Sequence, residues 1–515
     1  MRPNAPVTRG EVAALLCQVF DIPTAGLTAY QPQFLTSSTL GAAQVLSLEE
    51  LRANGVLIWQ IQQALTGFGL YDPNQGQPGR YTAALSEALT RFCRAVNLNT
   101  MSTLQFGPSF FTALRDTESL SLRLDVAGDR QAIYLDFLRQ EAGYDAMKLA
   151  ILDAGVATSP YAQEINAFAQ RLKRPLGINP ELGKVATFQP YPAVGKRPWV
   201  NDTALTWLHP DIQQACLCIG RPGKTWESAW LGRAANRPVE CWSATKILPI
   251  LYVVNQANRH NPMRSVDQVY VRDRDRSKQA DLMAIAQDIV SYDSKIGSSN
   301  ALAHALKLFA SEADLDAWLK GLTGTTDLSF RGRYGEPPAF IQPDLLDAAT
   351  QQVMLTAQTT AHGGSNTVSV YDLTRVITMV GWHMQLDPTM RLPSAQWHSL
   401  APTIASFGVD SARYVDAAIA KLGLQDYLKD VVILSKLGFG RSSIRDRTEL
   451  VYTALVQFQT QSAGGNRPDR PYSLGFTLLA AKDLQDPNQE ARALDARMAT
   501  AVTEILRQLL LRTGW

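Results

Sequence analysis

The sequence predicts an α+β fold in more than one domain, and three observations support this. After about residue 200, strand-like and helix-like segments form separate runs, an arrangement typical of α+β domains. The last stretch, Asn488 to Arg512, carries apolar residues at helical spacing. The chain has 515 residues, of which 46% are hydrophobic and 19% charged, so it is globular and long enough for about two to four domains.

Charge and hydropathy argue against two classes of partner. The formal net charge is +2 and no run is rich in lysine or arginine, so we expect no nucleic acid as partner. The longest apolar run, Ile247 to Val254, is interrupted by Pro249 and is too short for a transmembrane segment. Met1 to Pro6 lacks an apolar signal segment. Either the chain stays in the cytosol, or the residues that export it are missing from this sequence.

The cysteines and histidines predict no metal site and no cofactor. The six histidines form no ligand cluster, and the spacing of the five cysteines suits no zinc site. Cys216 and Cys218 would point the same way on a strand. One of them could pair with Cys241 in an oxidising compartment, but the simpler expectation is buried free thiols.

The first segment, residues 1–30, carries a capped helix. Thr8 and Glu11 occupy the N-cap and capping-box positions before the apolar helix Val12 to Phe20. The motif resembles the closing part of an S-layer homology repeat, a family that binds cell-wall polymers. An ordinary capped helix is the alternative.

Residues 52–118 form the next expected domain. A glutamine-leucine helix leads to a glycine turn, a turn-rich stretch and two more helices. These segments are Ile61 to Leu65, Phe68 to Tyr71, Asp72 to Arg80, Tyr81 to Val96 and Ser109 to Leu114. The pattern resembles the peptidoglycan-binding-like domain, a small all-α three-helix module. A generic helical hairpin is the alternative.

Residues 119–199 are expected to be a helical segment followed by a linker. Helical patterns cover Tyr134 to Ala142, Ala146 to Leu152 and Pro160 to Leu172. Residues 175–200 contain five prolines and few helix formers, which is typical of a linker. We therefore expect the last domain to span 200–515.

The last domain is expected to contain strands, then helices, then strands and a closing helix. A β-pair surrounds the turn Arg221 to Lys224, and a mainly helical region runs from Trp242 to Trp382. The expected strands are Ala215 to Gly220, Ser228 to Ala234, Val431 to Ser435, Glu449 to Gln459 and Tyr472 to Ala481.

Ser243 and Lys246 begin the helical region and are the first candidate catalytic pair. Their spacing places both side chains on one helix face, at the N-terminus of the apolar stretch that follows. A lysine whose pKa is depressed can take the proton of a serine hydroxyl. A serine followed by lysine at this spacing also occurs by chance in a chain this long, so the pair is weak evidence alone.

Two further motifs follow in order. Ser298 and Asn300 precede the apolar helix Ala301 to Phe309. They could transfer a proton and bind a substrate amide, or simply cap the helix. Lys436 and Gly438 end an apolar strand, where a lysine could hold negative charge or could merely be solvated.

The three motifs together, in this order, resemble the serine β-lactamase and penicillin-binding-protein superfamily, and most of all its class A β-lactamase branch. The resemblance implies a β-lactamase/transpeptidase-like domain, with an antiparallel sheet and a helical subdomain, over about 200–515. It implies that Ser243 is the nucleophile and Lys246 its proton partner. It further implies roles for Ser298, Asn300, Lys436 and Gly438, and an oxyanion hole made by the N–H of Ser243 and that of Phe439 or Gly440.

Two departures from this family concern the substrate and deacylation. Leu437 stands where the family has a hydroxyl that helps to hold a substrate carboxylate. The candidates to replace that hydroxyl are Arg441, Ser442, Ser443 and Arg445. The family uses a loop glutamate to activate the deacylating water, and Glu336 is the candidate for it. The alternative for Glu336 is a surface carboxylate that pairs with Arg331 or Arg333.

These resemblances imply a wall-associated serine hydrolase in the periplasm or cell wall. Its partner would be peptidoglycan or a β-lactam-like small molecule. The alternatives are a D,D-peptidase or transpeptidase acting on peptidoglycan stems, an esterase on the same fold, and a non-enzymatic wall-binding or sensing protein.

Overall fold

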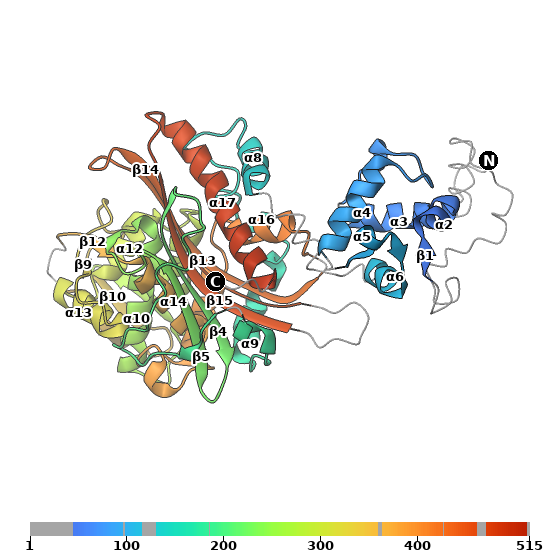
Figure 1. The fold of residues 1–515 in the computed structure, drawn as a ribbon. Helices are drawn as coiled ribbons and strands as arrows, with labels where there is room; N and C mark the ends of the chain where they lie inside the picture. The colour runs from blue at the N-terminus through green and yellow to red at the C-terminus, as the bar shows by residue number, and fades with distance from the viewer. Residues whose placement is uncertain are drawn as a thin grey trace, which may run out of the picture. The chain divides into compact units, whose positions relative to one another are not determined.

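The computed structural model describes residues 45–511, except 69, 96–97, 116–129, 185, 359–362, 426 and 461–469. The chain divides between residues 122 and 123 into two compact units, and each is described by itself (Figure 1). The helix expected within residues 1–30 lies outside the described residues.

The N-terminal unit is helical, with one short strand pair that the sequence did not indicate. Its three main helices lie where the sequence predicts them: α3 (Gly55–Gly67), α4 (Ala83–Ala95) and α6 (Pro108–Arg115). The remaining elements are α2 (Leu48–Ala53), α5 (Thr100–Thr103) and the antiparallel pair β1 (Leu46–Ser47) and β2 (Gln105–Phe106). The rings of Phe68 and Phe110 pack on Phe92 in the core, with centroids 5.8 and 5.7 Å away.

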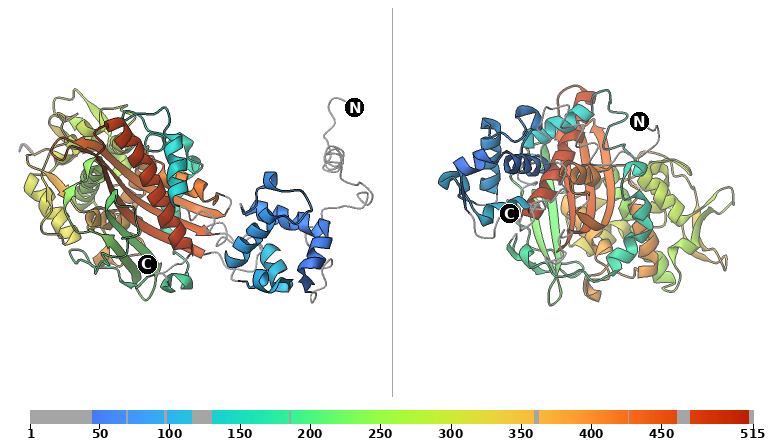
Figure 2. Two further views of the ribbon diagram at one scale, coloured as in Figure 1. Left: turned by 45° about the horizontal axis from the view of Figure 1, so that its top comes forward. Right: turned by 90° about the vertical axis from the view of Figure 1, so that its right-hand side faces the viewer.

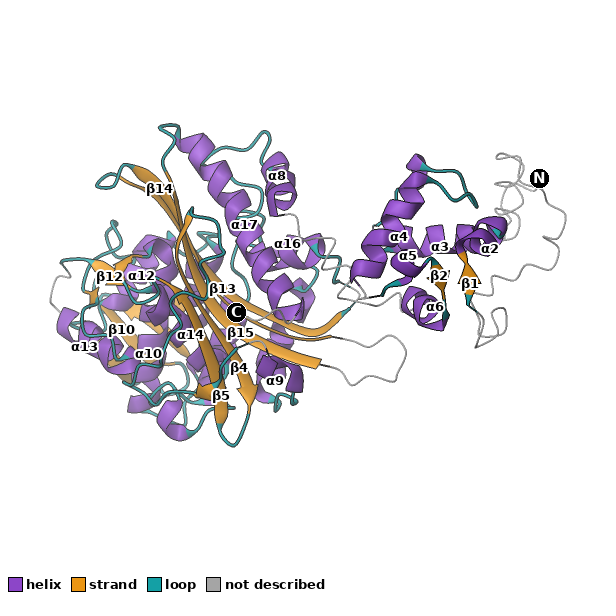
Figure 3. Ribbon diagram, viewed as in Figure 1, coloured by secondary structure: helices purple, strands orange, loops and turns teal. Residues whose placement is uncertain are grey.

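The C-terminal unit is α+β and is built on a six-stranded antiparallel sheet (Figure 3). The strand order is β13-β14-β15-β4-β5-β3, with β13 at one edge. The strands are β3 (Gln189–Pro190), β4 (Ile212–Pro222), β5 (Trp226–Arg233), β13 (Leu428–Ser442), β14 (Arg447–Thr460) and β15 (Arg470–Lys482). Every long strand that the sequence predicts is present.

Helices α14 (Val370–Gly381) and α17 (Pro487–Leu511) pack on this sheet (Figure 2). A Cβ on Gly381 of α14 would meet Leu455 of β14, and Leu455 pairs with Leu434 of β13. Arg441 of β13 instead pairs with Glu490 of α17. Because side chains alternate between the faces of a strand, α14 and α17 cover opposite faces. The even-numbered residues around Lys436 therefore point to the α14 side.

The predicted buried stripe of the closing helix is confirmed. Leu494, Met498, Val502, Ile505 and Leu509 are all fully buried on α17. The further helices α8 (Arg130–Gln140) and α16 (Tyr414–Lys421) pack against α17.

The region between β5 and β13 is less uniformly helical than the sequence suggests. Its α-helices are α10 (Ile247–His260), α11 (Leu282–Ser291), α12 (Ser299–Lys307), α13 (Glu312–Thr323), α14, α15 (Trp397–Phe407) and α16. A four-stranded sheet has the order β11-β10-β7-β8, and a three-stranded sheet has the order β6-β12-β9. Their strands are β6 (Val239–Glu240), β7 (Val269–Asp273), β8 (Gln279–Asp281), β9 (Ser329–Phe330), β10 (Pro343–Asp347), β11 (Val353–Thr356) and β12 (Asn366–Val368).

The expected linker over 175–199 is instead part of the C-terminal unit. β3 pairs with β5, and Tyr191 is buried with its ring edge-on to Trp382. The Tyr191 hydroxyl also lies 2.8 Å from that of Thr378. The proline content correctly indicated a stretch without long helices, but aromatic packing, not composition, determines whether such a stretch is folded.

Two of the three helical patterns before that stretch are present, and one is not. α8 and the 3-10 turn leading into α9 (Phe168–Lys173) match the prediction. Ala146 to Leu152 forms turns, because carboxylates take its amide hydrogens. The N–H of Ala150 donates to Glu141 (3.0 Å) and that of Ile151 to Asp495 (2.9 Å). These amides are therefore not available for helical hydrogen bonds.

Within the part of the chain that the structure describes, no helix combines the length and apolar character needed to cross a membrane. Cys93, Cys216, Cys218 and Cys241 are free and buried. No cluster of metal-ligating side chains occurs among the same described residues.

Candidate active site

Ser243 and Lys246 lie on a 3-10 turn, Trp242–Lys246, that continues into α10. The sequence predicts an α-helix here, and the tighter turn brings the pair into closer alignment because 3-10 residues three apart eclipse each other. Lys246 is only 1% exposed, and most of α10 behind it is buried.

Burial changes the chemistry of Lys246. Burial and, to a smaller extent, the nearby positive charge of Lys436 lower the pKa of the ammonium to about 6, while Glu336 acts in the opposite direction. At neutral pH the amine is therefore largely unprotonated and can accept a proton from a serine.

Ser298 is both a helix cap and a neighbour of Glu336. Its Oγ accepts a hydrogen bond from the N–H of Ala301 (3.1 Å), the N-cap interaction that the sequence allowed. The same hydroxyl donates to Glu336. Asn300 Nδ2 donates to the other Glu336 oxygen at 2.8 Å. The second motif and the candidate base are thus one hydrogen-bonded group.

Ser299 is a site residue that the sequence analysis missed. Lys246 Nζ donates to Ser299 Oγ at 2.9 Å, and Ser299 donates onward to the carbonyl of Ile289 at 2.9 Å. The sequence contains two adjacent serines here and no signal that tells which one faces the lysine.

Helix α12 also holds the loop that carries Glu336. His304 Nδ1 lies 2.7 Å from the Glu336 carbonyl, which can only accept, so Nδ1 carries the hydrogen. Lys307 Nζ donates to the carbonyl of Gly332 (2.6 Å) and to Asn366 Oδ1 (2.9 Å). Burial lowers the pKa of Lys307 to about 7. The loop backbone is thereby attached to the same helix that begins with Ser298.

The Glu336 carboxyl is ionised at neutral pH. The hydrogen bond from Ser298 lowers its pKa most, and Asn300 and the Lys246 charge lower it further, while partial burial opposes them. Of the two arginines weighed as surface partners, Arg331 pairs with Asp316 at 3.0 Å.

The third motif brings Lys436 into the site. Its Nζ lies 3.7 Å from the centre of the Tyr292 ring and 3.9 Å from Asp410 Oδ1, and both charged groups are fully buried. Burial lowers the pKa of the Lys436 ammonium and raises that of the Asp410 carboxyl.

Gly438 lies directly against the backbone of the first motif. A Cβ at this position would be 2.7 Å from the amide nitrogen of Ala244, 2.7 Å from the carbonyl oxygen of Cys241 and 3.0 Å from the amide nitrogen of Ser243. All three are backbone atoms, so they cannot move aside independently. Only glycine lets β13 approach the serine this closely.

The orientation of the β13 backbone distinguishes between Phe439 and Gly440 as the second candidate oxyanion donor. The carbonyl of Leu437 accepts a hydrogen bond from the Tyr292 hydroxyl at 3.2 Å, so it points away from β14, toward the free edge. In an antiparallel strand, the N–H and C=O of one residue point to one side of the strand, and those of the next residue point to the other side. The N–H of Phe439 therefore faces the free edge, and that of Gly440 faces β14.

Tyr292 is the second site residue that the sequence analysis missed. It ends α11 with φ of 62°, in the left-handed region, which is uncommon for a bulky side chain. Burial raises the pKa of its hydroxyl, and the Ser243 side chain acts in the opposite direction. Because Tyr292 belongs to none of the three motifs, only the fold reveals its position.

Three of the four residues proposed to replace the missing hydroxyl at Leu437 have partners of their own, and the fourth, Ser443, is exposed. Arg441 pairs with Glu490 and, at 2.6 Å, with Asp446. Ser442 Oγ accepts from the N–H of Arg445. Arg445 in turn pairs with Glu449 at 2.6 Å and with Glu240 at 2.9 Å.

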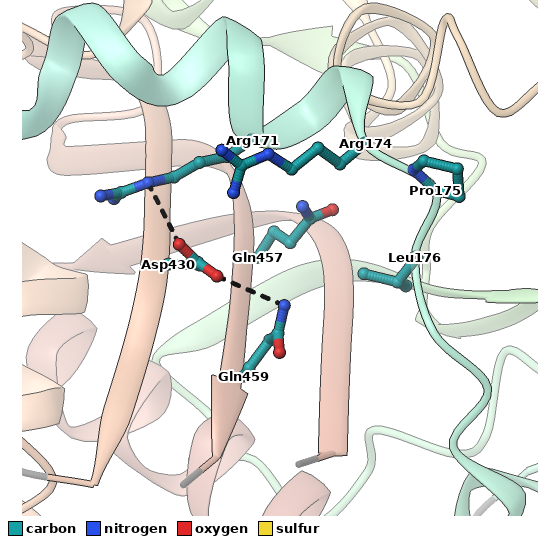
Figure 4. Close-up of a pocket in the computed structure, with 7 residues that line it drawn as sticks. All are labelled: Arg171, Arg174, Pro175, Leu176, Asp430, Gln457 and Gln459. Carbon is teal, nitrogen blue, oxygen red and sulfur yellow. Dashed lines mark hydrogen bonds and ion pairs between the residues drawn. The ribbon is translucent and has the colours of Figure 1, made fainter.

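A surface pocket lies away from these residues (Figure 4). Its lining includes Arg171, Asp430 and Gln459, where Asp430 is joined to the other two. Asp430 precedes Lys436 by about six residues on β13, roughly 20 Å along a strand. None of the predicted site residues lines this pocket.

Comparison with known proteins gives little. No protein-family model matches the chain, and no curated protein matches it. Among solved structures, a β-lactamase from Desulfarculus baarsii DSM 2075 aligns with a TM-score of 0.34 and 13% identity, over 57% of this chain and 92% of that one. A likeness at this level assigns no activity.

The contact at Gly438 generates a stability prediction. We expect Gly438→Ala to lower the free energy of unfolding by about 1–3 kcal/mol, because the added methyl overpacks against backbone. Urea denaturation followed by circular dichroism would measure it. The matched control is Gly321→Ala in α13, where a Cβ meets nothing within 4 Å and helix propensity should add about 0.5–1 kcal/mol. Equal stability of the two variants would contradict the close approach.

Proposed function

We propose that this protein is a serine hydrolase of β-lactamase type that forms an acyl-enzyme at Ser243 and cleaves an amide, such as a β-lactam, or a related acyl bond. The observation that carries the proposal is the buried Lys246, whose pKa is lowered to about 6, one 3-10 turn from Ser243. The order of the three motifs and their approach to one another support it.

In the acylation step, Ser243 Oγ transfers its proton to the neutral Lys246 amine and attacks the carbonyl carbon. The negative charge that develops on the carbonyl oxygen is stabilised by the N–H groups of Ser243 and Phe439. The carbon–heteroatom bond then breaks, and the leaving group takes a proton from the candidate donor Ser298, which would regain one from the Lys246 ammonium.

In the deacylation step, Glu336 is the candidate base. Its carboxylate would take a proton from water as the water attacks the acyl-enzyme carbonyl, and this proton would pass through Lys246 to the Ser243 oxygen as the acyl bond breaks. The ionised state of Glu336 and its hydrogen bonds to Ser298 and Asn300 support this role.

An esterase on the same fold is the second candidate. Leu437 offers no hydrogen-bond donor, and Arg441 and Arg445 are already paired. These observations favour an ester without a carboxylate over the D,D-peptidase alternative, whose substrates end in one.

We also propose that the N-terminal unit holds the enzyme at peptidoglycan, in the periplasm or cell wall. The residue pattern of α3 and α4 supports this. On α3, Val56 and Trp59 lie one turn apart and are 60% and 41% exposed, and an exposed aromatic ring can stack on sugar rings.

The acyl-enzyme itself can be tested directly. Incubation with a fluorescent penicillin, a chromogenic cephalosporin and p-nitrophenyl acetate should acylate the parent protein with at least one of them, and Ser243→Ala should not be acylated. Fast turnover of the cephalosporin indicates a lactamase, stable labelling a peptidase or sensor, and turnover of the ester alone an esterase. If Ser243→Ala behaves as the parent does with every compound, the proposal is wrong. Intact-protein mass spectrometry identifies the acylated residue.

The pKa of Lys246 predicts a pH profile. The acylation rate should rise as pH increases through about 6, because the amine must lose its proton before it can accept one from Ser243. Lys246→Arg should lose acylation at all pH values between about 5 and 9, since a guanidinium stays protonated. The exposed Lys224 provides the control, Lys224→Arg, which should keep the parent profile. An unchanged profile in Lys246→Arg would exclude Lys246 as the base.

The wall-binding proposal predicts that the full chain sediments with insoluble peptidoglycan. Trp59→Ala should reduce the bound fraction severalfold, because it removes an exposed ring and leaves the core intact. Exposed Leu135 on α8 of the other unit gives the control, Leu135→Ala. Equal binding of the parent and Trp59→Ala would show that this face of α3 is not the contact surface.

A further inference from the structure

We propose that the site selects substrates that are uncharged or cationic beside the scissile bond on the β13 side, and that it discriminates against substrates with a carboxylate there. This inference rests on the proposed acyl transfer at Ser243. It specifies the substrate class of that same site.

Four basic side chains of β13 and its hairpin with β14, from Lys436 onward, have carboxylate partners. Lys436 faces Asp410, and Arg441 is bound by Glu490. Arg445 and Arg447 share Glu449, at 2.6 and 2.9 Å. An incoming carboxylate would have to displace one of these internal partners before it could form an ion pair of its own.

The charge states of Lys246 and Glu336 also disfavour a substrate carboxylate. Lys246 is largely neutral above pH 6, and Glu336 carries a negative charge. Glu449, which Arg445 and Arg447 already neutralise, also accepts a hydrogen bond at 3.0 Å from Nε1 of Trp242, the residue before Ser243. An anion near Ser243 therefore meets the negative charge of Glu336, and like charges in such a site cost binding free energy.

The side chains of the edge strand supply no substitute. Leu437 has no donor, and the residues that pair with Gly438 and Phe439 on β14 are Val451 and Leu450. The edge thus offers backbone N–H and C=O groups beside apolar side chains. A carboxylate desolvated there without a partner is unfavourable, whereas an ester or amide loses little.

A pair of thioesters that differ only in this charge tests the inference. Benzoyl-D-alanyl-thioglycolate carries a carboxylate on the leaving group, and its methyl ester is neutral. We expect kcat/KM of the parent protein to be at least about tenfold higher for the methyl ester, with most of the difference in KM. A ratio of one or below would overturn the inference.

A matched pair of variants tests the part played by Leu437. Leu437→Thr introduces a hydroxyl donor, and Leu437→Val introduces a side chain with the shape of threonine but no hydroxyl. We expect the ratio of kcat/KM for the methyl ester to kcat/KM for the carboxylate to be about threefold or more lower in the threonine variant than in the valine variant. Identical ratios in the two variants would exclude this position as a determinant.

Binding to Ser243→Ala separates the inference from the chemistry. Titration of the two thioesters, followed by NMR, should give a dissociation constant at least about fivefold lower for the methyl ester. Hydrolysis that persists in Ser243→Ala would refute the proposed nucleophile, yet the ratio of the two dissociation constants would still test the charge preference. Equal or tighter binding of the carboxylate would overturn it.

Discussion

The close approach of β13 to the Ser243 turn is the constraint on which the site depends. Gly438 lies against the backbone of the turn, and a Cβ on Gly440 would be 2.4 Å from the Trp242 ring. Gly438 and Gly440 are two residues apart on β13 and face the same turn, so neither position can carry a side chain. In the proposed reaction, this contact would also bring the N–H of Ser243 and that of Phe439 together as oxyanion donors.

Helix α12 aligns the second half of the site. Ser298 and Asn300 at its N-terminus bind the Glu336 side chain, while His304 and Lys307, one and two turns on, bind the backbone of the Glu336 loop. Because all four belong to one rigid element, the carboxylate has a fixed position relative to the lysine that faces the same helix end. Such preorganisation removes a reorganisation cost from each proton transfer.

Sequence alone could predict the features that follow from local pattern. The strands, the closing helix and the three motifs depend on periodicity and on residues at element ends, and these were found. Ser299, Tyr292 and the packing of Tyr191 depend on which segments meet in space, which no local pattern encodes. The turns at Ala146 to Leu152 were missed for the same reason, because Asp495, far along the chain, accepts hydrogen bonds from two of their amides.

The number of donors on each side chain limits how the second motif can act. The Asn300 amide has two hydrogens, so it can keep its hydrogen bond to Glu336 and still donate to a substrate carbonyl. The Ser298 hydroxyl has one hydrogen, which it donates to Glu336. To protonate a leaving group, Ser298 must turn away from the carboxylate and be reprotonated from a neighbour. Lys246 bonds to Ser299 in the free protein, so this transfer requires substrate to draw the lysine and Ser298 together. In the proposed mechanism, the leaving group would therefore help to bring together the residues that protonate it.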